Sequence, residues 1–143
     1  MTLGNPIAIL GIDHVVLRVR DVAGMQRFYC EVLGCSVEKV QAEIGLTQLR
    51  AGWSLIDLVD VAGKLGRMGG APPGVEGRNM DHLCFRIEPF DRDAIVTRLA
   101  PFGISVGETV ERYGAEGNGP SVYFHDPEGN QIELKGPAAS PAH

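Results

Sequence analysis

The chain has 143 residues, enough for one domain that buries roughly two-thirds of the surface of its unfolded form. Hydrophobic residues make up 44% and charged residues 22%, as is usual for a globular protein in water. The net charge is −5 and the sequence contains no run of lysines or arginines, so nucleic acid and anionic membrane surfaces are not expected partners. No apolar run is long enough to span a membrane, and the first ten residues lack the basic leader of a signal peptide. Three cysteines form no CxxC pair, so we expect reduced thiols and a cytoplasmic protein.

The first half of the chain reads as a strand, a helix and three further strands. Residues 12–19 (I-D-H-V-V-L-R-V) are rich in β-branched residues and predict a strand. Asp21 is a candidate cap for a helix whose apolar residues follow at helical spacing until Gly34. The three short strands are predicted at residues 36–40, 46–50 and 53–59. Together these elements make a first module over residues 10–62.

A stretch rich in glycine and proline, residues 63–79, predicts a linker or a mobile cover. The pattern then starts again: M-D-H-L-C-F-R-I at residues 80–87 matches the first strand at an offset of 68 residues. A second helix is predicted between the cap Asp91 and the stop Gly103, and three strands follow, beginning with residues 104–106. This second module covers residues 80–136, and residues 1–9 and 137–143 are predicted to be terminal tails.

The second module ends in a strand, a turn and a strand, S-V-Y-F-H-D-P-E-G-N-Q-I-E-L-K at residues 121–135. Side chains alternate faces along a strand, so Glu133 points away from its neighbours Ile132 and Leu134. A carboxylate held on a rigid strand between aliphatic residues needs a partner that offsets its desolvation.

The two modules carry the same chemistry at equivalent positions, within a chain predicted to be α+β with two tandem βαβββ modules. Each has a histidine on its first strand, His14 or His82, and a carboxylate on its last, Asp57 or Glu133. Duplication around an approximate two-fold axis brings equivalent positions together, which predicts one divalent transition metal, such as Ni, Co, Zn, Mn or Fe(II). The alternatives are hydrogen-bonded core histidines and, for Asp57, a structural acceptor.

Three motifs are similar to those of one superfamily: D-H-V-V-L-R-V with F-Y-x-x-V-L-G, D-H-L-C-F-R-I, and F-x-D-P-E-G-N-Q-I-E-L. They resemble the vicinal oxygen chelate superfamily of glyoxalase I, fosfomycin-resistance thiol transferases, extradiol dioxygenases and bleomycin-resistance proteins. The resemblance implies a half-barrel-like mixed sheet around a concave metal site, and a homodimer. It implies His14, His82 and Glu133 as metal ligands. Asp57 falls on the fourth ligand position, where glyoxalase I has a longer glutamate or glutamine.

The resemblance also implies contacts to a small-molecule substrate. Tyr123 falls on a position that often reaches the substrate, although a sheet tyrosine with an exposed hydroxyl is the alternative. Arg18 and Arg78 fall on or near positions that contact a substrate carboxylate, as a bidentate guanidinium can; solvated arginines are the alternative. Asp13 and Asp81, each before a histidine, are predicted to be structural and to point to the opposite face.

The expected function is that of a metal-dependent, glyoxalase-like lyase or isomerase. Its small substrate would chelate the metal through neighbouring oxygens, and a carboxylate, Glu133 first and Asp57 second, would carry the proton. The alternatives are an extradiol-type dioxygenase using Fe(II), with Tyr123 positioning the substrate, and a metal-free binding protein like the bleomycin-resistance proteins. A thiol transferase is less favoured because Val16 stands where those enzymes have a threonine. Against the glyoxalase I pattern, Asp57 replaces the longer ligand and Val61 replaces an asparagine that helps to hold glutathione, so a glutathione-dependent housekeeping enzyme is not expected.

Overall fold

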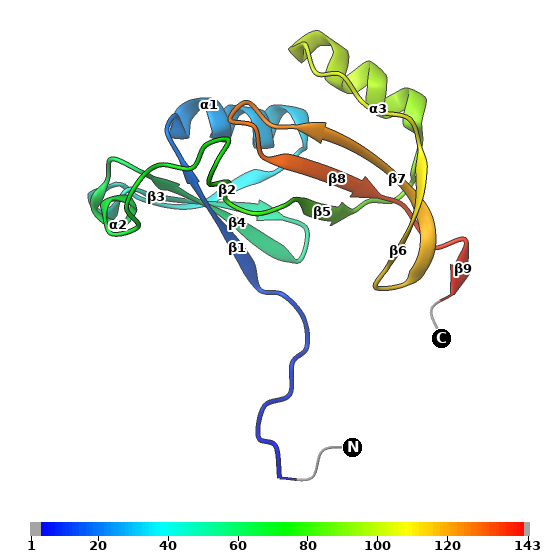
Figure 1. The fold of residues 1–143 in the computed structure, drawn as a ribbon, viewed down its shortest axis with the longest axis horizontal. Helices are drawn as coiled ribbons and strands as arrows, with labels where there is room; N and C mark the ends of the chain where they lie inside the picture. Colours follow the sequence, from blue (N-terminus) through cyan, green and yellow to red (C-terminus); the bar gives the residue numbers. More distant parts are fainter. Residues whose placement is uncertain (1–3, 142–143) are drawn as a thin grey trace.

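Two copies of one folding unit make up the protein in this computed structural model, which describes residues 4–141. Each copy forms its own sheet, in the strand order β1-β4-β3-β2 or β5-β8-β7-β6, and a short β9 pairs with β7 (Figure 1). The α+β class and the two βαβββ modules predicted from the sequence are confirmed. The strands and α-helices are β1 (His14–Val19), α1 (Val22–Arg27), β2 (Ser36–Gln41), β3 (Leu46–Ala51), β4 (Ser54–Asp60), α2 (Lys64–Arg67), β5 (Leu83–Arg86), α3 (Arg92–Leu99), β6 (Val110–Gly114), β7 (Gly117–His125), β8 (Gln131–Lys135) and β9 (Ser140–Pro141). A π-helical turn (Phe28–Val32) and two 3-10 turns (Ala42–Ile44 and Ala100–Phe102) complete the set.

Both sheets are mixed and have the same register. In each module the first strand runs parallel to the fourth, and the remaining pairs are antiparallel. Asp57 on β4 lies opposite Val16 on β1, and Glu133 on β8 lies opposite Cys84 on β5. The two carboxylates therefore occupy equivalent positions in the two sheets.

The helices begin and end where the sequence predicts. The Asp21 side chain accepts a hydrogen bond from the backbone N–H of Gly24 at 3.0 Å, and Asp91 accepts one from Ala94 at 3.1 Å. Each bond satisfies an N–H group at a helix start that has no partner within the helix. Gly34, which follows the π-helical turn, has a φ of +79°, a left-handed conformation that glycine adopts without steric cost.

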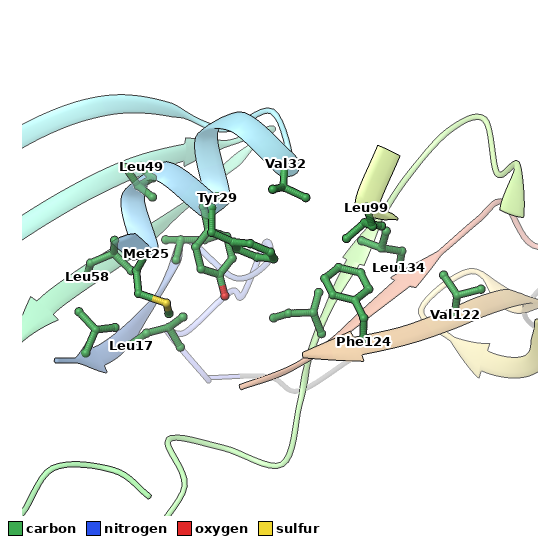
Figure 2. Close-up of a cluster of buried hydrophobic side chains, with 14 residues drawn as sticks. Leu17, Met25, Tyr29, Val32, Leu49, Leu58, Leu99, Val122, Phe124 and Leu134 are labelled. Atoms are coloured by element: carbon green, nitrogen blue, oxygen red, sulfur yellow. The ribbon is translucent and has the colours of Figure 1, made fainter. Parts of the chain in front are cut away.

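One hydrophobic core joins the two modules, because helices pack against one face of each sheet (Figures 1 and 2). In β8 the core takes Ile132 and Leu134 and leaves Glu133 on the other face, as the alternation predicts. The buried apolar residues of the core are Leu17, Val19, Met25, Phe28, Tyr29, Val32, Leu49, Ile56, Leu58, Leu99, Val122, Phe124, Ile132 and Leu134.

A buried hydrogen bond connects the modules at the turn between β7 and β8. The Tyr29 hydroxyl donates to Asp126 Oδ2 at 2.7 Å, and Asn130 Nδ2 donates to the same oxygen at 2.8 Å. Burial, followed by the charge of Asp126, raises the pKa of Tyr29 well above its usual value. The hydroxyl therefore remains a donor at physiological pH, and the turn is fixed to the first module.

Two strand predictions in the second module are wrong in their limits. β5 starts at Leu83, so His82 precedes the strand instead of lying on it. The segment 104–109 forms no strand, and the next strand begins at Val110. In this segment the backbone carbonyls of Gly107 and Val106 accept hydrogen bonds from the Arg92 guanidinium, at 3.1 Å and 3.4 Å.

The segment 63–79 is held against β1 by Arg18. Its guanidinium donates to the backbone carbonyls of Gly66 and Gly70, both at 2.9 Å, and of Ala71 at 3.0 Å. Asn79 also bonds the backbone N–H and carbonyl of Arg18, at 3.2 and 3.0 Å. Among residues 4–141, no helix has both the length and the apolar character needed to cross a membrane.

Candidate metal centre

A histidine and a carboxylate meet on the face of the second sheet that points away from the core. Glu133 Oε1 lies 3.2 Å from His82 Nε2, and Oε2 accepts a hydrogen bond from the Ser121 hydroxyl at 2.5 Å. Glu133 is buried, with 5% of its surface exposed, and Ser121 is fully buried. Because each carboxylate oxygen has its own neighbour, the orientation of Glu133 is fixed.

Tyr123 lies on the same face of the sheet. Its facing could not be predicted from the sequence, because the turn between Tyr123 and Glu133 interrupts the alternation of side chains along the strand. It lies directly opposite Glu133 on β7, and its ring centroid is 5.9 Å from that of His82. Arg112 Nε donates to the Tyr123 hydroxyl at 3.2 Å. The pKa of Tyr123 is raised, first by desolvation and also by Glu133, against the lowering effect of the Arg112 hydrogen bond. Tyr123 therefore presents a neutral hydroxyl beside the His82–Glu133 pair.

Cys84 stands opposite Glu133 on the neighbouring strand β5. Desolvation, followed by the charge and hydrogen bonding of Glu133, raises the pKa of the Cys84 thiol to about 12. The thiol is therefore protonated at neutral pH in the metal-free protein and is a poor nucleophile there.

The first module repeats the arrangement with a shorter acid. Asp57 is buried, with 4% of its surface exposed, and Gln48 Nε2 lies 3.2 Å from each of its carboxylate oxygens. His14 is half-exposed, and its pKa is raised, first by the hydrogen bond to Asp13 and then by the charge of Asp57. Gln48 lies opposite Asp57 just as Tyr123 lies opposite Glu133. His14 and Asp57 in the first module, and His82 and Glu133 in the second, are therefore two half-sites at equivalent positions.

Asp13 and Asp81 contact the histidines, contrary to the prediction that they point away from them. Asp13 Oδ1 is 2.8 Å from His14 Nδ1, and Asp81 Oδ2 is 2.6 Å from His82 Nδ1. The hydrogen bond from His82 lowers the pKa of Asp81. The strand alternation fails because both aspartates lie before the regular part of their strands. A carboxylate at Nδ1 fixes the ring and leaves Nε2 as the free nitrogen, as in many metal-bound histidines.

The two half-sites are not assembled into one centre within a single chain. Within residues 4–141, no three side chains of His, Cys, Asp or Glu gather closely enough to hold a metal ion. A largely apolar cleft of about 930 Å³ runs between the modules, with His14 and Trp53 from the first and Cys84 and Arg86 from the second along its wall. In the second module His82 and Glu133 are therefore in contact, and in the first module His14 and Asp57 occupy the equivalent positions.

The two predicted substrate arginines lie in different surroundings. The guanidinium of Arg18 donates to three backbone carbonyls of the segment 63–79, which makes it a structural residue in this conformation. Arg78 is exposed in the loop before His82, and its charge contributes to lowering the pKa of Asp81. Contact of either arginine with a substrate stays a prediction.

The His82–Glu133 pair fits one half of a divalent metal site. Ligand atoms about 2 Å from a zinc-like ion, at roughly tetrahedral angles, lie about 3 to 3.5 Å from each other. The 3.2 Å between His82 Nε2 and Glu133 Oε1 falls within this range. Imidazole and carboxylate are donors that suit zinc, iron, nickel and related ions.

Several residues of these half-sites were not identified from the sequence: Ser121, Gln48 and Arg112, and the contacts of Cys84 with Glu133. Strand alternation could have indicated Ser121, which lies two residues before Tyr123, and Cys84, which lies two residues after His82. Gln48 could not be identified from the sequence, because its position opposite Asp57 depends on the register between β3 and β4.

Comparison with known proteins identifies the fold family. The family model of the Glyoxalase/Bleomycin resistance protein/Dioxygenase superfamily matches residues 11–134. Virulence protein STM3117 of Salmonella typhimurium is 37% identical over 125 residues, which cover 86% of this chain and 81% of that protein. Its crystal structure matches with a TM-score of 0.75 at 33% identity, covering 92% of this chain and all of that one.

Two structures of lower identity have the same fold. Lactoylglutathione lyase from Agrobacterium tumefaciens matches with a TM-score of 0.66 at 21% identity, over 90% of this chain and 95% of that chain. Fosfomycin resistance protein FosX from Mesorhizobium loti matches with a TM-score of 0.65 at 20% identity, over 92% and 96%. The matched family model, together with the relative at 37% identity, shows that this chain belongs to the Glyoxalase/Bleomycin resistance protein/Dioxygenase superfamily, also called the vicinal oxygen chelate superfamily.

Proposed function

We propose that the protein is a metal-dependent, glyoxalase-like lyase or isomerase. Its small substrate would bind a divalent transition metal through two neighbouring oxygens. His14, His82 and Glu133 are the proposed ligands, and Asp57 is the proposed fourth. The observation that carries the proposal is the 3.2 Å approach of His82 Nε2 to Glu133 Oε1, repeated in chemistry and register by His14 and Asp57.

We further propose that a homodimer completes the centre, with the first module of one copy facing the second module of the other. This arrangement is supported by the finding that, among residues 4–141, no three side chains of His, Cys, Asp or Glu gather closely enough to hold a metal ion. It is also supported by large apolar side chains that stay exposed around the His14 half-site, including Ile12 at 83%, Trp53 at 100% and Val16 at 45%. A stable dimer would remove such surface from water. The three free cysteines fit the reducing cytoplasm proposed as its location.

The chain supplies a proton carrier and its supports. Bound between the modules, a divalent ion would act as a Lewis acid on the substrate oxygens. The Glu133 carboxylate would take a proton from a substrate carbon and return it to the neighbouring carbon. The hydroxyl of Ser121 holds Oε2 of this carboxylate, so Glu133 keeps one orientation. Tyr123 would contact the substrate beside it.

Two other functions use the same residues differently. In an Fe(II)-dependent extradiol dioxygenase, Tyr123 would position a catechol. A metal-free binding protein would hold its ligand in the apolar cleft between the modules. The buried Glu133, with an imidazole at each half-site, favours the metal-dependent functions.

The test of metal binding is elemental analysis of untagged protein purified without added metal. We expect about one transition ion per chain, lost in His82→Ala and in Glu133→Gln but kept in His125→Ala, which removes an exposed histidine at the end of β7. Protein without bound metal that also takes up no Ni, Co, Zn, Mn or Fe(II) on titration would contradict the proposal. Turnover of methylglyoxal plus glutathione, or of catechols, then separates the two enzymes.

The test of the shared site is to mix two inactive variants. In a dimer of one His14→Ala chain and one His82→Ala chain, a site shared between chains keeps one intact centre, because each chain supplies the histidine that the other lacks. Random exchange should therefore restore about a quarter of the wild-type metal content. No restoration, with exchange of subunits verified by mass spectrometry, would show that the site does not form across the dimer.

A further inference from the structure

A deep apolar cleft lies where the two modules meet. The two sheets are separate, and their edge strands β1 and β5 both contribute to its walls. The volume of the cleft is about 930 Å³, within the range of about 300 to 1,000 Å³ that is typical of small-molecule sites. Because the cleft belongs to a single chain, a ligand in it would need neither the proposed metal nor the proposed dimer.

Core residues of both modules form the floor of the cleft. Val32 and Ile56 come from the first module and Leu99 and Leu134 from the second, and their exposed fractions lie between 1% and 6%. Val32 stands on one side, and Leu99 and Leu134 stand on the other (Figure 2). The cleft therefore reaches buried hydrocarbon, unlike a shallow apolar patch on the surface.

Small side chains keep the cleft open. Longer apolar side chains would fill the space between the modules, but the chain places glycine, alanine or cysteine at several lining positions: Gly34, Cys35, Ala51, Gly52, Ala94 and Ala115. Desolvation, followed by the influence of Cys30, raises the pKa of the Cys35 thiol to about 11. This thiol therefore stays neutral at physiological pH and adds no charge to the wall.

Both arginines that line the cleft are held by partners within the chain. The Arg98 guanidinium donates hydrogen bonds to the backbone carbonyls of Glu31 and Val32. Arg86 forms an ion pair with Glu116. A carboxylate or phosphate on a ligand would have to displace these partners, so the cleft is not prepared for an anion.

The other ionisable groups of the lining are engaged or neutral. Asp91 accepts a hydrogen bond from the backbone N–H of Ala94, and Asp13 Oδ1 lies 2.8 Å from His14 Nδ1. The thiol of Cys84 is protonated at neutral pH in the metal-free protein. A ligand charge of either sign would therefore lose its water and compete with a partner that is in place, which is costly.

We infer that the cleft between the modules binds an uncharged hydrophobic small molecule, such as an aromatic compound. Such a ligand would be held by the removal of its own apolar surface and that of the lining from water. Leu134 lines the cleft, whereas Glu133 points to the opposite face of β8, so the ligand would lie on the core side of the second sheet. Trp53, which also lines the cleft and is fully exposed, would pack against the bound molecule.

Trp53 gives a direct signal for the test, because it is the single tryptophan of the chain and lines the cleft. Metal-free protein is titrated with N-phenyl-1-naphthylamine, an uncharged aromatic probe, and binding is followed by energy transfer from Trp53. The comparison probe is 8-anilinonaphthalene-1-sulfonate, which has the same rings and one added sulfonate. We expect the neutral probe to saturate one site per chain and the sulfonate to bind at least about tenfold more weakly.

Two substitutions fill the cleft, one from each module. Ala51→Phe on β3 and Ala94→Phe on α3 should each weaken binding of the neutral probe by about tenfold or more, because the added ring takes the space of the ligand. Ala94 is exposed, so its substitution should leave the fold intact, which circular dichroism checks. Ala23→Phe, at an exposed position on α1, is the matched control and should leave the affinity unchanged.

A second copy of the chain is the competing occupant of the cleft. If it filled the cleft, the apparent affinity for the neutral probe would fall as the protein concentration rises, together with dimer formation in sedimentation, and the inference would be overturned. An affinity that stays constant over a hundredfold range of protein concentration supports the inference. Equal affinity for the two probes, no saturable binding, or unchanged affinity in Ala94→Phe would each overturn it.

Discussion

Replacement of Ser121 by alanine tests whether the hydrogen bonds around Glu133 prepare it as a metal ligand. Ser121 is fully buried, and its hydroxyl donates to Glu133 Oε2 at 2.5 Å, the length of a strong bond to a charged acceptor. The substitution removes one oxygen atom and leaves one oxygen of a buried carboxylate without its donor. Hydrogen bonds to charged groups contribute about 1.5 to 3 kcal/mol, so we expect the free energy of unfolding to fall by that amount.

The larger consequence concerns metal affinity. Without the serine, Glu133 can rotate, and Oε1 is no longer held beside His82 Nε2. Loss of a group that orients a metal ligand typically weakens metal binding by about 10- to 100-fold, which we expect for Ser121→Ala. The assay is competition for zinc against a chromogenic chelator, together with urea denaturation of the metal-free protein. Ser36→Ala, at an exposed position on β2, is the matched control and should change neither quantity. A loss of stability with unchanged zinc affinity would refute the reasoning, because the serine would then support only the fold.

Three further predictions concern a histidine, a thiol and a glycine. Asp13 raises the pKa of His14 above its usual 6.5, so this pair stabilises the fold at mildly acidic pH. The effect disappears as the pH rises through the raised pKa. In metal-free Asp13→Asn, NMR titration should give a lower His14 pKa, and an unchanged pKa would contradict this cause. With its pKa raised to about 12, Cys84 should react with iodoacetamide at pH 8 orders of magnitude more slowly than an ordinary thiol of pKa about 8.5. Mass spectrometry measures the rate of this reaction. A rate equal to that of free cysteine would contradict the prediction. Gly119→Ala should reduce the free energy of unfolding, measured in urea, by about 1 to 3 kcal/mol, because the new methyl group collides with Lys135 Nζ and the Pro137 carbonyl. Gly74→Ala, which adds a methyl group in open space, should have little effect. Equal effects of the two substitutions would contradict the steric argument.

Local patterns were sufficient for the elements and for the repeat. Asp21, Gly34 and Asp91 act at the helix ends where their chemistry predicts, because caps and left-handed glycines depend on a few neighbouring residues. The alternation along β8 correctly turned Glu133 away from the core. The same reasoning failed for Asp13 and Asp81, because strand alternation does not hold for residues before a strand begins.

Contacts between distant residues were beyond the sequence. The facing of Tyr123 depended on the pairing of β7 with β8, and the position of Arg18 depended on carbonyls about fifty residues further along the chain. Nothing near Lys135 in sequence indicates that its ammonium is enclosed without a hydrogen-bond partner in the described part of the chain, since Gly114 and Gly119 belong to other strands.

By itself, the sequence determined the two βαβββ modules and the equivalence of His14 with His82 and of Asp57 with Glu133, since duplication is written in the order of residues. Only the tertiary structure decided that His82 contacts Glu133 with no third His, Cys, Asp or Glu ligand beside them among residues 4–141, and that a buried lysine lies on the same face of that sheet. The physical reason is that duplication is visible in the order of residues, whereas the two modules share one core and are joined by contacts such as that of Tyr29 with Asp126. Such contacts join residues that are far apart in the sequence.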